Sequence, residues 1–166
     1  MTKRGAVLEV CISTEKGQPK EPLAEGRLIA DYGLEGDAHA GTQRQVSLLC
    51  EGSVAKLRRQ GMEIRPGDFA ENLLISGLAP ADFDLGLRLR VGGDGPDSGA
   101  LLEVTQIGKE CHKGCAIRER IGDCMMPREG IFARVLRGGP VRAGSLIELL
   151  APGETNTDSG ISESKE

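Results

Sequence analysis

Aromatic side chains are scarce in this sequence. Its 166 residues include no tryptophan, one tyrosine and three phenylalanines, at Tyr32, Phe69, Phe83 and Phe132. Leucine, isoleucine, valine and alanine must therefore supply the apolar core, and a chain of this length is large enough to form one such core as a single domain. Proteins that bind single-stranded nucleic acid stack bases on aromatic rings, so the composition argues against nucleic acid as a partner.

Long apolar runs are also missing. No stretch approaches the roughly 20 apolar residues that a membrane span needs. The apolar segment that follows Met1-Thr2-Lys3-Arg4 is too short and too charged for a signal peptide. The formal net charge of −4 favours neither a polyanion nor a membrane surface as a partner. We therefore expect a cytoplasmic protein that does not associate with membranes.

The cysteines do not suit a disulfide framework, because their number is odd and the chain is expected to be cytoplasmic. Cys11 and Cys50 lie inside apolar, strand-like runs and are expected to be buried as small apolar residues. The remaining three fall close together in the sequence: Cys111, Cys115 and Cys124.

Glycine and short apolar runs are abundant. Many of the 24 glycines fall between apolar segments, where tight turns need them. The alternation of Leu85, Leu87, Leu89 and Val91 predicts that these residues share one face of a strand. Eight strands are expected, at Ala6–Ile12, Arg27–Ala30, Gln45–Leu49, Leu73–Ile75, Leu85–Val91, Leu101–Ile107, Ile131–Leu136 and Leu146–Leu150.

The helical signals are few. Residues Glu51–Gln60 are good helix formers with Gly61 placed to end them, and a second short helix is expected over Ala116–Ile121. Residues 92–99 are predicted to form a flexible hairpin loop. Many short strands and few helices predict a mainly β fold, a closed or nearly closed antiparallel β-barrel with one to three short helices. We assign the barrel to residues 1–150 and a disordered polar tail to residues 151–166.

Three segments could carry chemistry. The first runs from Tyr32 to Gly41 and places Gly36, Asp37 and Gly41 around His39, with Arg44 close behind. A glycine-rich loop lets backbone N–H groups approach an anion, and the histidine and arginine would add donors. A tight turn with a capping aspartate is the alternative interpretation.

The second segment, Arg65–Asn72, combines a Pro-Gly-Asp turn with Glu71 and Asn72 just before a predicted strand. The Asn72 side chain offers both a donor and an acceptor, which suits the edge of a heterocyclic ligand. A polar turn without ligand contacts is equally consistent with these residues.

The third segment, Gln106–Ala116, follows a predicted strand and contains Cys111 among Lys109, His112 and Lys113. Neighbouring cations favour the thiolate, which is the form that attacks sulfur and binds soft metals. Cys111 is therefore the candidate catalytic residue.

Structural zinc is a rival explanation for the third segment. Cys111, His112, Cys115 and Cys124 could supply four nitrogen and sulfur ligands. Their spacing is unsuitable, because adjacent residues rarely reach one ion and the usual second Cys-x2-Cys pair is missing.

Taken in order, these segments resemble the MOSC domain family, named for the C-terminal domain of molybdenum cofactor sulfurases. The resemblance covers about residues 5–150. It rests on Gly-Asp-Ala-His-Ala-Gly at 36–41 with Arg-Gln-Val-Ser-Leu-Leu at 44–49, Pro-Gly-Asp-Phe-Ala-Glu-Asn-Leu at 66–73, a strand leading to Cys111, Arg-Val-Leu at 134–136, Gly-Gly-Pro-Val at 138–141 and Gly144. The family often has aspartate where this chain has Ser145.

The resemblance implies a β-barrel that binds molybdenum cofactor, a molybdopterin carrying Mo or W, or that handles sulfur around one cysteine. Cys111 would be that cysteine, as persulfide carrier or metal ligand, with Cys115 a second candidate ligand. His39, Arg44 and Asn72 would line the pocket, and the further candidate cofactor-binding residues are Gly36, Asp37, Gly41, Lys109 and His112.

The expected partners are cofactor biosynthesis or insertion proteins and a separate sulfur donor, since the chain has no room for a pyridoxal-phosphate domain. The chain itself is expected to be a monomer or a homodimer. A cofactor carrier without chemistry of its own, and a cofactor-dependent reductase of N-hydroxylated compounds, are the alternatives.

Overall fold

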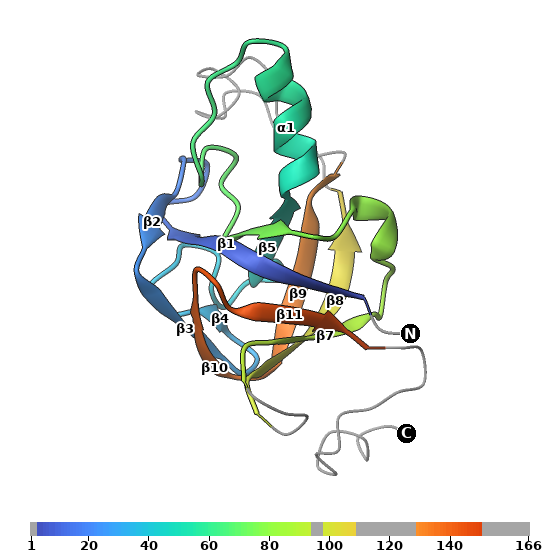
Figure 1. Cartoon of the computed structure of the whole chain (residues 1–166). Helices are drawn as coiled ribbons and strands as arrows, with labels where there is room; N and C mark the ends of the chain where they lie inside the picture. Colours follow the sequence, from blue (N-terminus) through green and yellow to red (C-terminus); the bar gives the residue numbers. More distant parts are fainter. Residues whose placement is uncertain (1–2, 94–97, 109–128, 151–166) are drawn as a thin grey trace.

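The computed structural model describes residues 3–93, 98–108 and 129–150 (Figure 1). It contains one α-helix, α1 (Glu51–Arg59), and a 3-10 turn at Pro80–Asp82 in these residues. The strands are β1 (Arg4–Ile12), β2 (Glu21–Leu23), β3 (Glu25–Ile29), β4 (Gly33–Leu34), β5 (Val46–Cys50), β6 (Leu73–Ser76), β7 (Arg88–Val91), β8 (Ala100–Ile107), β9 (Ile131–Arg137), β10 (Gly139–Arg142) and β11 (Leu146–Leu149).

Seven strands close into a ring, which confirms the predicted barrel. The order is β1-β11-β7-β8-β9-β5-β6, and β6 returns to β1. The ring closes where the N-terminal half of β1 pairs with β11, with Gly5 opposite Ile147. Every pair in the ring is antiparallel except β5 and β6, which are parallel. Parallel neighbours need a crossover connection, and α1 lies in it, at one end of the barrel (Figure 1).

Alternate residues of the strands point to opposite sides of the barrel wall. Val46, Leu48 and Cys50 of β5 belong to the main core cluster, which fills the inside. Leu49 lies between them in sequence and belongs to a second cluster, with Val54 and Leu57 of α1. This outer cluster shows that the apolar stripe of α1 covers the outside of the wall.

The sequence did not predict three short strands, β2, β4 and β10. β3, β4 and β10 form a separate antiparallel sheet, and β2 pairs with the C-terminal end of β1. β2, β4 and β10 are two to four residues long and carry few large apolar side chains. Their pairing depends on neighbours far away in the sequence, so no local alternation marks them.

The prediction for the start of β7 was wrong. The strand begins at Arg88, and Leu85 is 68% exposed instead of buried. Gly86 takes φ +86°, which turns the chain before the strand can start. The expected helix over Ala116–Ile121 and the polar tail 151–166 lie outside the described residues, as do residues 94–97 of the predicted hairpin loop.

The loop that follows α1 is pressed against the loop that follows β1. The backbone N–H of Lys20 donates to the Gly67 carbonyl at 2.7 Å. Gly67 has φ +89°, and a Cβ there would collide with the Lys20 carbonyl oxygen. Glycine is therefore required at 67 for both its conformation and its lack of a side chain.

We predict that Gly67→Ala destabilises the protein far more than Gly61→Ala. Gly61 also has positive φ (+94°), but a Cβ there meets nothing within 4 Å. The control should cost roughly 1–2 kcal/mol for the left-handed conformation, and Gly67→Ala about 1–3 kcal/mol more for the collision. Urea unfolding measures both free energies. Equal losses would show that the contact with Lys20 is not tight.

Candidate functional site

A buried ion pair lies at the centre of the first predicted segment. The Nζ of Lys20 is 2.8 Å from Oδ1 of Asp37, and neither side chain is exposed to solvent. The Ser13 hydroxyl lies 3.1 Å from the same Nζ. The backbone N–H groups of Ser13 and His39 donate to the two carboxylate oxygens of Asp37, at 3.1 and 3.0 Å. The aspartate thus joins the end of β1 to the loop after β4.

These contacts decide the ionisation of Asp37. Burial alone would raise its pKa, but the hydrogen bond and the charge of Lys20, together with the hydrogen bond from the backbone N–H of His39, outweigh burial and hold the pKa well below its usual range. The carboxylate therefore stays charged, and its partner ammonium has a fixed acceptor.

His39 is the member of this group that reaches the surface. Its Nδ1 lies 3.3 Å from Nζ of Lys20, and its side chain is 21% exposed. The backbone N–H groups of residues 37–41 all donate to acceptors within the protein. An anion at this loop would therefore meet the side chain of His39 and not these amides.

Arg44 is joined to His39 through Thr42. The Thr42 hydroxyl donates to the His39 carbonyl at 2.7 Å and accepts from the Arg44 backbone N–H at 3.1 Å. The Arg44 guanidinium carbon lies 5.7 Å from the ring centroid of Phe132, within the range of a cation–π contact. The loop thus brings together two of the predicted site residues.

Gln106 extends this connection to the end of β8. Its Oε1 accepts from Nε of Arg44 at 3.3 Å, and its Nε2 donates to the Gly108 carbonyl at 2.8 Å. Gly108 is the last described residue before the segment that contains Cys111. Cys111, Lys109, His112 and Cys115 all lie outside the described residues.

Asn72 lies in the barrel wall. Its Oδ1 accepts from the Ser47 backbone N–H at 3.0 Å, and its Nδ2 donates to the Cys11 carbonyl at 3.0 Å. The side chain is fully buried and links β1, β5 and the start of β6. Its predicted contact with a ligand stays a prediction, and these bonds give it a structural role.

Glu71 is a buried carboxyl group whose environment the sequence did not reveal. Its two oxygens accept from the backbone N–H groups of Gly67 and Phe69, at 2.7 and 3.1 Å. Burial raises its pKa to about 7 despite these hydrogen bonds. The carboxyl group holds the turn whose Gly67 carbonyl receives the Lys20 N–H.

Both described thiols lie in the protein interior. Cys11 and Cys50 are buried and free, as predicted, and burial raises the pKa of each thiol to about 12. In the part of the chain that the structure describes, no group of three or more His, Cys, Asp or Glu side chains could hold a metal ion. No helix in that part is long and apolar enough to cross a membrane.

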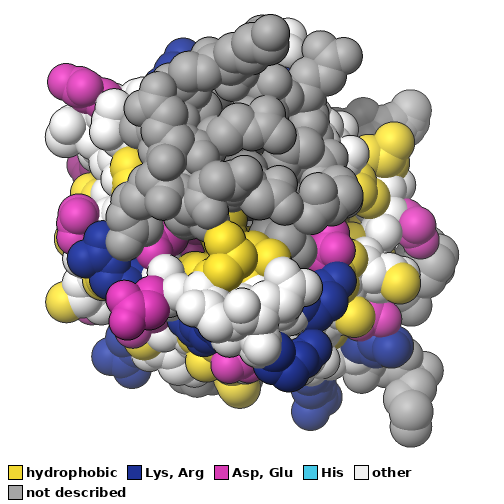
Figure 2. Space-filling view, turned by 90° about the horizontal axis from the view of Figure 1, so that it is seen from above, with side chains coloured by type: hydrophobic (Ala, Val, Ile, Leu, Met, Phe, Trp, Pro, Cys, Tyr) yellow, Lys and Arg dark blue, Asp and Glu magenta, His cyan; other side chains and the backbone are white. Residues whose placement is uncertain are grey.

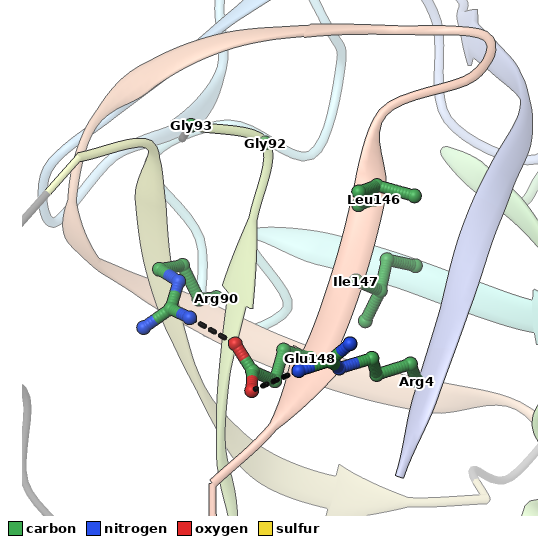
Figure 3. Close-up of a pocket in the computed structure, with 7 residues that line it drawn as sticks. All are labelled: Arg4, Arg90, Gly92, Gly93, Leu146, Ile147 and Glu148. Carbon is green, nitrogen blue, oxygen red and sulfur yellow. Dashed lines mark hydrogen bonds and ion pairs between the residues drawn. The ribbon is translucent and has the colours of Figure 1, made fainter. Parts of the chain in front are cut away.

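A separate cavity of about 250 Å³ is lined by residues of β7, β11 and the start of β1, together with Gly92 and Gly93 (Figure 3). Glu148 there pairs with both Arg90 and Arg4, so these three lining side chains keep a net charge of +1. None of the predicted site residues is among its described lining residues. On the face seen in Figure 2, basic and acidic side chains are likewise interspersed around the edge.

Comparison with known proteins agrees with this architecture. The model of the MOSC domain family matches residues 35–148, most of the chain. This chain therefore belongs to the MOSC domain family, a family associated with molybdenum cofactor binding. No curated protein sequence matches it.

Solved structures share the fold. The YuaD protein from Bacillus subtilis superposes with a TM-score of 0.70 and 21% identity, over 90% of this chain and 97% of that one. YiiM from Geobacillus stearothermophilus gives 0.66 and 22%, over 90% and 76%. YiiM from Escherichia coli gives 0.59 and 21%, over 91% and 70%. At these identities the likeness concerns the fold alone.

Glu71 should make the protein less stable as the pH rises. Its pKa goes from an ordinary 4.5 to about 7 on folding. The folded state thus keeps a proton that the unfolded chain releases. The contribution of Glu71 is most favourable below pH 4.5 and is lost as the pH rises to 7, by at most about 1.4 kcal/mol per pH unit.

Urea unfolding of wild type and Glu71→Gln across this range checks the prediction, because the variant lacks the titrating group. The exposed Glu63→Gln is the control and should follow wild type. If the free energy of unfolding changes with pH in the same way for wild type and Glu71→Gln, the prediction is wrong.

Cys11 and Cys50 should resist alkylation in the folded protein. At about pH 8 a thiol with an unperturbed pKa is partly thiolate and reacts, whereas these two are protonated and buried. Peptide mapping by mass spectrometry after iodoacetamide treatment measures the labelling, and the same chain in guanidinium gives full labelling as the control. Fast native labelling at either residue would show that the barrel opens there.

Proposed function

We propose that the protein binds molybdenum (or tungsten) cofactor in the cytoplasm and takes part in its sulfuration or maturation. The observation that carries this proposal is the hydrogen-bonded path from His39 through Thr42, Arg44 and Gln106 to Gly108. This path connects the loop that contains His39 to the end of β8, from which the chain continues to Cys111. Membership of the MOSC family supplies the ligand class.

The described donors suit an anionic group such as the pterin phosphate. In the part of the chain described, no carboxylate pairs with Arg44, whose polar contact is the neutral side chain of Gln106. Among these residues its charge therefore has no acidic partner, and its guanidinium carbon lies 5.7 Å from the centroid of the Phe132 ring. Charge-assisted hydrogen bonds of this kind are the strong ones in anion recognition. His39 and Arg44 would thus hold the phosphate.

Cys111 would supply the chemistry beside this binding site. A thiolate could carry a persulfide sulfur received from a separate donor protein, or ligate the metal directly. When bound, the cofactor would supply a metal centre able to accept a sulfur ligand. The second candidate function, a carrier that passes cofactor to an insertion protein, uses the same His39 and Arg44 without Cys111.

Cofactor retention tests the proposal. Each protein is mixed anaerobically with isolated molybdenum cofactor and gel-filtered, and molybdenum and pterin are counted in the protein peak. We expect wild type to retain both and Arg44→Met to bind at least tenfold more weakly, because a charged hydrogen bond is lost. Arg134→Met is the matched control, since Arg134 is an exposed arginine of β9 paired with Glu103.

Cys111→Ala separates the two functions. Loss of retention, or loss of sulfur transfer with retention intact, supports the role of its thiol. Full retention and no thiol-dependent transfer in either protein favours the carrier. If wild type retains no cofactor, the proposed function is wrong.

A further inference from the structure

The buried ammonium group of Lys20 contacts the ring of His39 as well as the carboxylate of Asp37. This ammonium lies against Oδ1 of Asp37 at 2.8 Å and Nδ1 of His39 at 3.3 Å, and it has no solvent exposure. We propose that Lys20 is a positioning residue that fixes His39 in the tautomer with its proton on Nε2, so that His39 acts as a hydrogen-bond donor and not as a metal ligand.

The chemistry of the two groups sets the direction of this hydrogen bond. An ammonium group donates hydrogen bonds and accepts none, so Nδ1 must be the acceptor. A neutral imidazole with an accepting Nδ1 carries its proton on Nε2. The competing arrangement, an Nδ1–H donated to Asp37, would have to span 3.7 Å to Oδ2, which is too long for a hydrogen bond.

The same contacts argue against metal ligation by His39. Metal-binding histidines almost always donate their second ring N–H to a carboxylate, a carbonyl or water, which strengthens the ligating nitrogen. Here Nδ1 of His39 accepts a hydrogen bond from the Lys20 ammonium group, and the positive charge withdraws electron density from the ring. The arrangement instead leaves an N–H on Nε2, which suits an acceptor oxygen of a ligand.

The position of Lys20 is fixed from several sides. Its backbone N–H donates to Gly67, and the Ser13 hydroxyl lies 3.1 Å from Nζ. Asp37 is fixed in turn by the backbone N–H of His39 itself, at 3.0 Å from Oδ2. Buried ion pairs are weak contributors to stability compared with apolar packing. Precise placement of the imidazole is therefore the better explanation for this pair.

Nuclear magnetic resonance tests the tautomer without any cofactor. The chain has two histidines, and His112→Gln assigns the signals of His39. In 15N-histidine-labelled wild type at about pH 8, where imidazole is ordinarily neutral, long-range 1H–15N correlations should show a bare Nδ1 and a protonated Nε2. A protonated Nδ1 in wild type overturns the inference, and this measurement needs no change near the site.

Lys20→Met then tests the cause. We expect it to shift His39 toward a mixture of tautomers, whereas Lys3→Met, which removes an exposed lysine paired with Asp82, should change nothing. Because Lys20→Met leaves Asp37 buried and unpaired, a variant that also carries Asp37→Asn is the neutral alternative if the single variant fails to fold. An unchanged Nε2–H tautomer in the folded variant overturns the role of Lys20.

The role of His39 as a hydrogen-bond donor to the cofactor rests on the proposed function, and a separate binding measurement tests it. Lys20→Met or the double variant should bind cofactor about tenfold more weakly, and unchanged affinity overturns the donor role. If wild type shows the Nε2–H tautomer but binds no cofactor, the proposed function fails while the assignment of Lys20 stands.

Discussion

The contact between Lys20 and Asp37 places two opposite charges where neither is exposed. Removing such charges from water costs several kcal/mol per ion, and only close geometry with further hydrogen bonds offsets that cost. Here the backbone N–H groups of Ser13 and His39 supply those bonds. The end of β1, the approach to β2 and the loop after β4 must therefore keep their relative positions, because movement of any one exposes an unpaired buried charge.

The loop between α1 and β6 holds Lys20 in place for that contact. Glu71 fixes the turn at Gly67, and the Gly67 carbonyl binds the backbone of Lys20. Asn72, next in sequence, ties β6 to β1 and β5. The two polar motifs that stand far apart in the sequence are thus parts of one support. The second motif holds the lysine, and the lysine orients the histidine of the first.

Alternation of apolar residues predicted most strands of the barrel, because each buries one face regardless of its distant partner. His39 and Arg44 could also be selected, since glycines and charges mark their loop. Lys20 could not, because it lies in a polar stretch 17 residues before Asp37 and only the closed fold joins them. Likewise the position of Asn72 before a strand did not show whether its amide faces a ligand or the wall.

In the proposed function, binding and chemistry belong to different segments of the chain. His39 and Arg44 are held by β-strands and their connecting loop, whereas Cys111 belongs to the segment that the chain enters at Gly108. Under this proposal a sulfur-transferring protein and a cofactor carrier would need the same histidine, arginine and buried lysine and would differ only at the thiol. The same barrel would then serve either proposed function, and the Cys111 thiol beyond β8 would decide between them.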